Sequence, residues 1–117
     1  MEALADPSPA VRREAATALG RIADGAAVSP LTAALADTEP EVRAAALAAL
    51  GRIRDPASVP AISRLLQDRE PMVRVGAATV LGRIGDRDSA GPLRALLHDP
   101  LSEVREAAEE ALRNLKR

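Results

Sequence analysis

The side chains that could take part in chemistry are few in this sequence. His98 is the only histidine, and the chain contains no cysteine. Metal sites and nucleophilic triads need several such groups in convergent positions. A lone histidine beside Asp99 is better explained as a cation placed at the end of a helix, where the helix dipole favours it. The sequence therefore predicts no catalytic residue, no metal ligand and no cofactor.

A row of arginines is the second feature that could bind something. Arg21, Arg52 and Arg83 follow one another at 31-residue intervals, and such a row could contact phosphate groups. However, 16 basic residues are balanced by 17 acidic ones, and the chain has no aromatic side chain on which a base could stack. We therefore expect no nucleic-acid partner, and we interpret the row as solvated or as the rim of a protein-binding site.

The elements that position these residues come from an internal repeat. The pattern Asp-x-x-x-x-Val-Arg starts at Asp6, Asp37, Asp68 and Asp99. Its fourth residue is proline in the first three copies and serine in the last. The first three copies continue into Leu-Gly-Arg-Ile, whose glycines indicate close approach of the next unit rather than a phosphate loop. A fixed period of this length is typical of a solenoid, in which each unit packs only against its neighbours.

Each repeat predicts two antiparallel helices. After Pro40, apolar residues recur at helical spacing through Ile53, and Asp55 is suited to cap the helix that follows. We expect one domain, 1–117, with units at about 6–36, 37–67, 68–98 and 99–117, and residues 1–5 as the remnant of a preceding helix. The predicted long helices are 9–22, 40–53, 71–84 and 102–115, and the predicted second helices are 27–36, 58–67 and 89–98.

The two ends of the array differ in sequence. Residues 1–5 align with only the tail of a second helix, so we expect the first long helix to be half uncovered. In the last unit Arg113 stands where the other units have glycine, and Glu109 and Glu110 replace small residues, as in a polar terminal cap. We therefore expect the C-terminus to be a natural end, and the N-terminus to be a cut or an edge for self-association.

The run Asp-x-x-x-x-Val-Arg followed by Ala-Leu-Gly-Arg-Ile resembles HEAT repeats, most of all the short repeats named after phycobilisome lyases. The resemblance implies an all-α, right-handed α-solenoid, or superhelix, of about three and a half helical-hairpin repeats. It also implies a ladder of ion pairs between units. We prefer this structural role to a ligand-binding arginine row, because stacking needs a charge beside its partner in every unit. The pairs are Asp6/Arg12, Asp37/Arg43, Asp68/Arg74 and Asp99/Arg105.

The same resemblance implies that the long helices line the concave side of the solenoid. The middle units would present small and apolar groups there, flanked by charges, which is how protein interfaces are built. An alternative is that the alanines only favour helix formation. We interpret the surface as a non-enzymatic scaffold that binds a partner protein of unknown identity. The residues expected to contact the partner are Arg13, Thr17, Arg21, Ala45, Arg52, Met72, Val75, Thr79 and Arg83.

Two other functions stay open at this point. The chain could be an accessory or regulatory part of an enzyme, such as a phycobilin-lyase-like subunit, or it could be an engineered or truncated array. HEAT-like deoxyhypusine hydroxylases hold iron through His-Glu pairs, and this sequence has none. No apolar run approaches the roughly 20 residues that a membrane span needs, so we expect no membrane partner and a cytoplasmic location.

Overall fold

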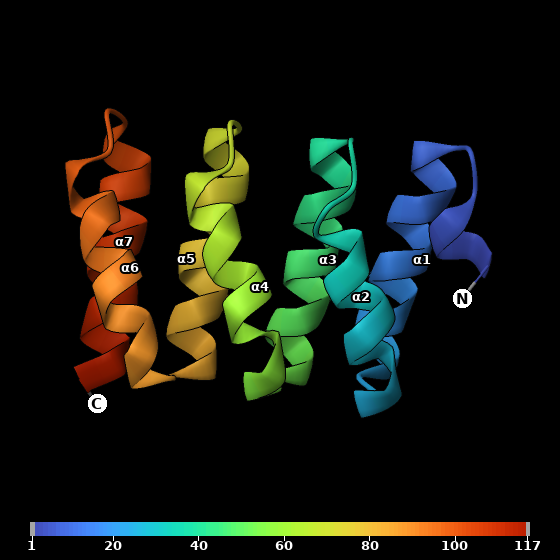
Figure 1. The fold of residues 1–117 in the computed structure, drawn as a ribbon, viewed down its shortest axis with the longest axis horizontal. Coiled ribbons are helices and arrows are strands. Elements are labelled where there is room, and N and C mark those ends of the chain that lie inside the picture. The colour runs from blue at the N-terminus through green and yellow to red at the C-terminus, as the bar shows by residue number, and fades with distance from the viewer. Residues whose placement is uncertain (1, 117) are drawn as a thin grey trace.

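The fold is known from a computed structural model, which describes residues 2–116 (Figure 1). All regular elements in this range are helices. Four of them are long, and three begin and end at the predicted residues, whereas the fourth extends one residue further than expected. The long helices are α1 (Pro9–Ile22), α3 (Pro40–Ile53), α5 (Pro71–Ile84) and α7 (Ser102–Lys116).

The boundaries of the long helices follow from local chemistry. Proline occupies the first turn of α1, α3 and α5, where its missing N–H costs no hydrogen bond. The same three helices end at a residue with left-handed backbone geometry: Ala23 (φ 55°), Arg54 (φ 59°) and Gly85 (φ 79°). The N–H of each residue bonds the carbonyl of a leucine four residues earlier, which closes the last helical turn.

The second helices are only partly α-helical, and together with their 3-10 turns they cover 25–34, 56–67 and 87–98, so each begins two residues earlier than predicted. Their α-helical parts are α2 (Val28–Ala34), α4 (Val59–Arg64) and α6 (Ala90–Ala95). Short 3-10 turns extend them: η2 (Gly25–Ala27), η3 (Pro56–Ser58), η4 (Leu65–Gln67), η5 (Arg87–Ser89) and η6 (Leu96–His98). The first of these turns in each unit is stabilised by an aspartate, whose carboxylate accepts a hydrogen bond from the backbone N–H of the residue two positions later. In the second unit, the N–H of Ala57 donates to Oδ1 of Asp55 at 2.9 Å.

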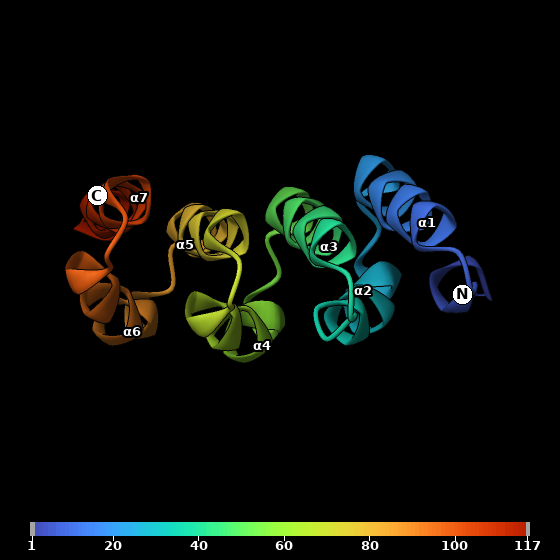
Figure 2. The same ribbon diagram turned by 90° about the horizontal axis from the view of Figure 1, so that it is seen from above.

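The helices form two layers. Figure 2 shows the long helices side by side in one layer and the short helices in the other, with the long ones on the inner side of a shallow bend. Each long helix packs against the next, and each short helix packs against the long helix of the following unit. The core between the layers consists of leucine, isoleucine, valine and alanine. The predicted all-α solenoid is confirmed, with overall dimensions of 37 × 27 × 18 Å.

Glycine allows the long helices to approach closely, as predicted. A Cβ atom added at Gly20 would lie 2.8 Å from the Cα of Ala49, and one added at Gly82 would lie 2.9 Å from the Cα of Ala111. At Gly51 the nearest atom is the side-chain Cγ2 of Val80, at 3.1 Å. The repeated glycine is therefore a packing residue at the joint between units.

The first long helix is less covered than the others. Val11 is 42% exposed, whereas the valines at the same repeat position, Val42, Val73 and Val104, are at most 1% exposed. Ile22 is 69% exposed at the other end of α1. The 3-10 turn η1 (Glu2–Ala5) packs beside α1, but it replaces only part of a second helix. Across residues 2–116, no helix is both long and apolar enough to cross a bilayer.

Candidate protein-binding face

The aspartates and arginines of the repeat form a ladder between units, but the predicted pairing is wrong, because each ion pair joins an arginine to the aspartate of the next unit and not to the one six residues earlier. Arg43 contacts both carboxylate oxygens of Asp68 in the next unit, with Nε to Oδ2 at 2.8 Å and Nη2 to Oδ1 at 2.9 Å. Its Nη1 also donates to the backbone carbonyl of Asp37, in its own unit, at 2.8 Å. Arg12 with Asp37 and Arg74 with Asp99 repeat this arrangement. Because the guanidinium groups of these arginines already donate hydrogen bonds to carboxylate and carbonyl oxygens of the array, few of their N–H groups are left for a ligand.

The pKa values of the ladder aspartates reflect this arrangement. Burial by itself would raise the pKa of each carboxyl group. For Asp37 and Asp68 the arginine of the preceding unit outweighs burial, together with the backbone N–H two residues on. For Asp99 the backbone N–H of Leu101 and then Arg74 have the same effect. The pKa of all three groups therefore lies below its usual value of 3.8.

The residues predicted to contact a partner share one face of the long helices. They follow the spacing of one helical stripe, and the stripes of neighbouring helices lie side by side. Met72 is the most exposed large apolar side chain of the described chain, at 81%. Within residues 2–116 the exposed members of the predicted set are Arg13, Thr17, Arg21, Arg52, Met72, Thr79 and Arg83.

Two predicted residues contribute less than expected. Ala45 and Val75 are half-buried and pack against the core, so only part of each side chain reaches solvent. The hydroxyl groups of Thr17 and Thr79 donate to the carbonyls of Arg13 and Val75 within their own helices, at 3.0 and 2.9 Å. These hydroxyls can therefore offer a partner acceptor lone pairs rather than a hydrogen.

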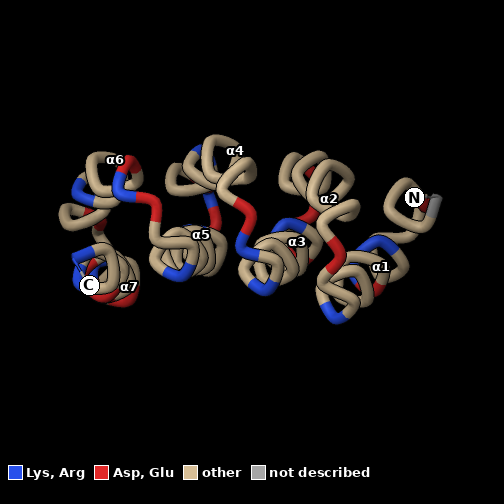
Figure 3. Tube along the Cα trace, turned by 90° about the horizontal axis from the view of Figure 1, so that it is seen from below, with Lys and Arg blue, Asp and Glu red and all other residues tan. Residues whose placement is uncertain are grey.

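The arginine row lies at the joints between units. The Nη1 atom of Arg83 would be 3.6 Å from a Cβ atom added at Gly51, so the glycine of one unit leaves room for the arginine of the next. Among the described residues, Arg21, Arg52 and Arg83 form no ion pair. Basic and acidic residues recur along the whole array in Figure 3 instead of forming one basic surface.

No clustered metal-binding chemistry accompanies this face. Within the described part of the chain, no three His, Cys, Asp or Glu side chains are grouped so that they could hold an ion. His98 is exposed at the end of η6.

Sequence reasoning missed a groove at the C-terminal end. The groove lies between α6 and α7, has a volume of about 680 Å³ and includes Leu97 and Leu112. A comparison of repeat positions could have found it, because two basic residues at its rim, Arg87 and Arg94, replace neutral ones in the inner units. Arg94, for example, stands where the preceding units have Ser63 and Thr32.

Comparisons with known proteins agree with this architecture. A family model described as HEAT repeats matches residues 1–62 and 28–113. None of the curated proteins compared with the chain matched it. Among solved structures, human deoxyhypusine hydroxylase in complex with glycerol superposes with a TM-score of 0.84 at 30% identity, over 98% of this chain and 41% of that one.

Two further structures show the same arrangement of helices. An engineered protein is 28% identical with a TM-score of 0.80, over 98% of this chain and 60% of that one. The complex of CpcE and CpcF of phycocyanin lyase from Nostoc is 22% identical with a TM-score of 0.71, over 97% of this chain and 62% of that one. The chain spans less than two thirds of each of these three proteins. Since the family match covers most of the sequence, this chain belongs to the HEAT-repeat family.

Proposed function

We propose that the chain is a non-enzymatic scaffold that binds a partner protein through the exposed stripe of its long helices. The observation that carries this proposal is Met72, an apolar side chain that is 81% exposed in the middle of the array. Helix propensity does not account for it, because unbranched charged residues favour a helix as well as methionine does. Met72 and the partly exposed Val75 one turn further on form a small apolar surface, and a surface of this kind favours contact with another protein.

Two exposed charges lie on the same pair of helices. Arg52 and Arg83 are in the last turns of α3 and α5, whereas Met72 is in the first turn of α5, and neither arginine forms an ion pair within residues 2–116. An apolar centre with a charged rim is the usual anatomy of an interface. In the proposed mechanism, a helix or loop of the partner lies along the exposed stripe, with its apolar part on Met72 and its polar part on Arg52 and Arg83 at the other end of the helices.

A site-specific crosslinker tests this proposal. A photoreactive amino acid placed at Met72 should yield a protein adduct in cells, whereas the same group at Arg64, exposed on the short-helix layer, should not. Binding of the captured protein should then fall about tenfold or more for Met72→Asp, with helicity unchanged because the side chain is exposed. Equal adducts at both positions, or no adduct at Met72, would contradict the proposal.

We also infer that the N-terminal edge supports self-association. Val11 and Ile22 are exposed on α1, and Ala15 and Ala18 lie between them on the same helical face. The opposite end of the array has Glu109 and Arg113 at packing positions, which disfavours head-to-tail stacking. A symmetric contact between two copies of α1 buries the apolar stripe on both sides.

A further inference from the structure

The groove between α6 and α7 occupies the position of a short helix. In the repeat register, its residues Leu97 and Leu112 correspond to Leu66 and Leu81, which are at most 3% exposed. Leu97 and Leu112 are only half-buried, because no further unit covers them in the described chain. In Figures 1 and 2, α6 lies beside α4 and α5, toward the C-terminal end of the array. The open groove lies in the same place relative to α6 and α7, so it corresponds to the position that α6 fills one unit earlier.

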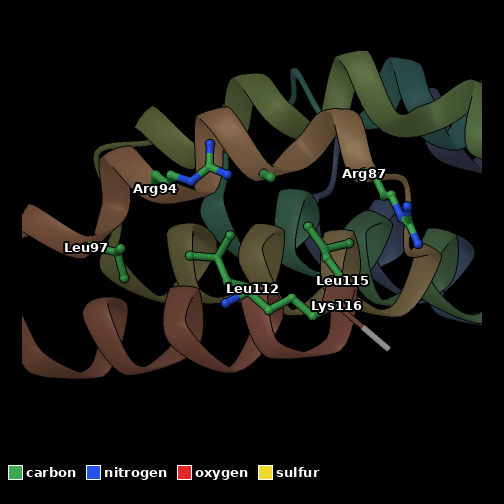
Figure 4. Close-up of a pocket in the computed structure, with 7 residues that line it drawn as sticks. Arg87, Arg94, Leu97, Leu112, Leu115 and Lys116 are labelled. Carbon is green, nitrogen blue, oxygen red and sulfur yellow. The ribbon is translucent and has the colours of Figure 1, made fainter.

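The floor of the groove is apolar. Figure 4 shows Leu112 and Leu115 extending from α7 toward α6, with Leu97 on the opposite side. Ala90 completes the floor. The groove lies between two packed helices, and its volume of about 680 Å³ suits the apolar face of one further helix.

The rim of the groove is basic and differs from the inner units. Arg87, Arg94 and Lys116 line it, and no acidic residue of the described chain does. None of the three forms an ion pair within residues 2–116. At the position that α6 fills, the corresponding residues are neutral: Pro56, Ser63 and Gly85. One unit earlier, Gly25 and Thr32 correspond to Arg87 and Arg94, whereas Arg54 corresponds to Lys116. The charges of Arg87 and Arg94 are therefore particular to the open groove.

We propose that this groove is a second docking site, which takes a short amphipathic helix whose apolar stripe is flanked by acidic residues. The leucine floor requires an apolar stripe, and the unpaired cations of the rim select negative charge beside it. The chain has no aromatic residue for base stacking, so the positive rim favours a protein helix over a nucleic acid. The site is separate from the exposed stripe around Met72.

Two designed peptides test the proposal. Both are helical, of about 14 residues, with leucines spaced to form one apolar stripe. One carries glutamates beside the stripe, and the other carries lysines at the same places. We expect the glutamate peptide to bind about tenfold more tightly or better, because each of three rim charges contributes a fraction of that factor. Its NMR shift changes should fall on α6 and α7.

Charge reversal provides the decisive comparison. Arg87→Glu with Arg94→Glu should reverse the preference toward the lysine peptide, and both side chains are exposed, so the fold should be kept. The matched control is Arg64→Glu with Arg69→Glu, which makes the same change in net charge at exposed sites elsewhere and should leave the preference unaltered. No measurable binding of the glutamate peptide, equal binding of the two peptides, or the same shift in the control pair would overturn the proposal. Met72→Asp should not affect peptide binding, so the two proposed sites can fail independently.

Discussion

At the scale of single residues, the ladder is the feature that most limits what this protein can do. Each of three arginines joins a carboxylate of the next unit to a carbonyl of its own unit. Arg105 has only the second of these bonds, to the carbonyl of Asp99 at 2.7 Å. The repeated charges therefore hold the units together, and the unpaired arginines of the exposed stripe are the ones available to a partner.

The ladder predicts unequal effects of removing equivalent arginines. Arg43→Ala should lower the free energy of unfolding by about 3 kcal/mol, because it leaves the nearly buried carboxylate of Asp68 without its partner. Arg105→Ala should cost about 1 kcal/mol, because it removes one hydrogen bond to a carbonyl. Urea unfolding at neutral pH measures both values. Equal losses would mean that the contact between units contributes little.

Acid should weaken the same contact. Asp37, Asp68 and Asp99 have pKa values below 3.8 in the folded state, and in the unfolded chain the pKa returns to about that value. Their contribution is therefore complete well above 3.8 and is lost as the pH falls through the folded pKa values. Stability should decrease below about pH 4, and the decrease should be smaller in Arg43→Ala, which has one pair fewer.

At the scale of the elements, the spacing between long helices depends on one repeated glycine. The helices touch through backbone atoms at Gly20 and Gly82, whereas a valine side chain lies opposite Gly51. A valine can rotate, but a backbone cannot move without shifting its whole helix. The three joints therefore differ in tolerance although their sequences are nearly the same.

Alanine substitutions should reveal this difference. Gly20→Ala and Gly82→Ala should each destabilise the fold by about 1 to 2 kcal/mol, since overpacking exceeds the gain in helix propensity. Gly51→Ala should be close to neutral, because the two effects nearly cancel. Gly91→Ala is the control, with nothing within 4 Å of the added atom, and should be neutral or slightly stabilising. Thermal unfolding compares all four, and a loss at Gly51 as large as at Gly20 would show that Val80 cannot adjust.

At the scale of the whole molecule, the two ends of the array differ in chemistry. The N-terminal edge has the apolar stripe of α1, and the carboxylate of Asp6, the first aspartate of the ladder, forms no ion pair within residues 2–116. The C-terminal end has a leucine-lined groove with a basic rim. An array of this kind offers separate surfaces at its two ends and along its long helices.

The N-terminal edge predicts concentration-dependent association. By sedimentation, the mass should rise from one chain toward two with increasing concentration, and hydrogen exchange of α1 should slow in parallel. Ile22→Asp should prevent both changes, because it places a charge in the apolar contact while the exposed side chain leaves the fold intact. Met72→Asp is the matched control and should associate normally. A single-chain mass at every concentration would contradict the inferred contact.

The sequence by itself determined the long helices and which aspartates and arginines form the ladder, whereas the pairing of Arg43 with Asp68 of the next unit, instead of Asp37, came from the tertiary structure. Asp37, Pro40 and Arg43 are local signals that recur with a fixed period, so the helix boundaries of one unit could be predicted from the equivalent residues of the others. The predicted second helices start two residues too late, because the 3-10 turns that open them begin directly after the capping aspartates, as Pro56 follows Asp55.

Only the tertiary structure decided how much of each side chain reaches solvent. Val75 and Met72 belong to the same predicted stripe, yet Val75 packs on the core and Met72 is exposed, because the neighbouring helix covers one side of α5. The groove between α6 and α7 was likewise absent from the sequence reasoning. A groove exists only where two helices meet and no third covers them, and that is set by contacts between residues far apart in the chain.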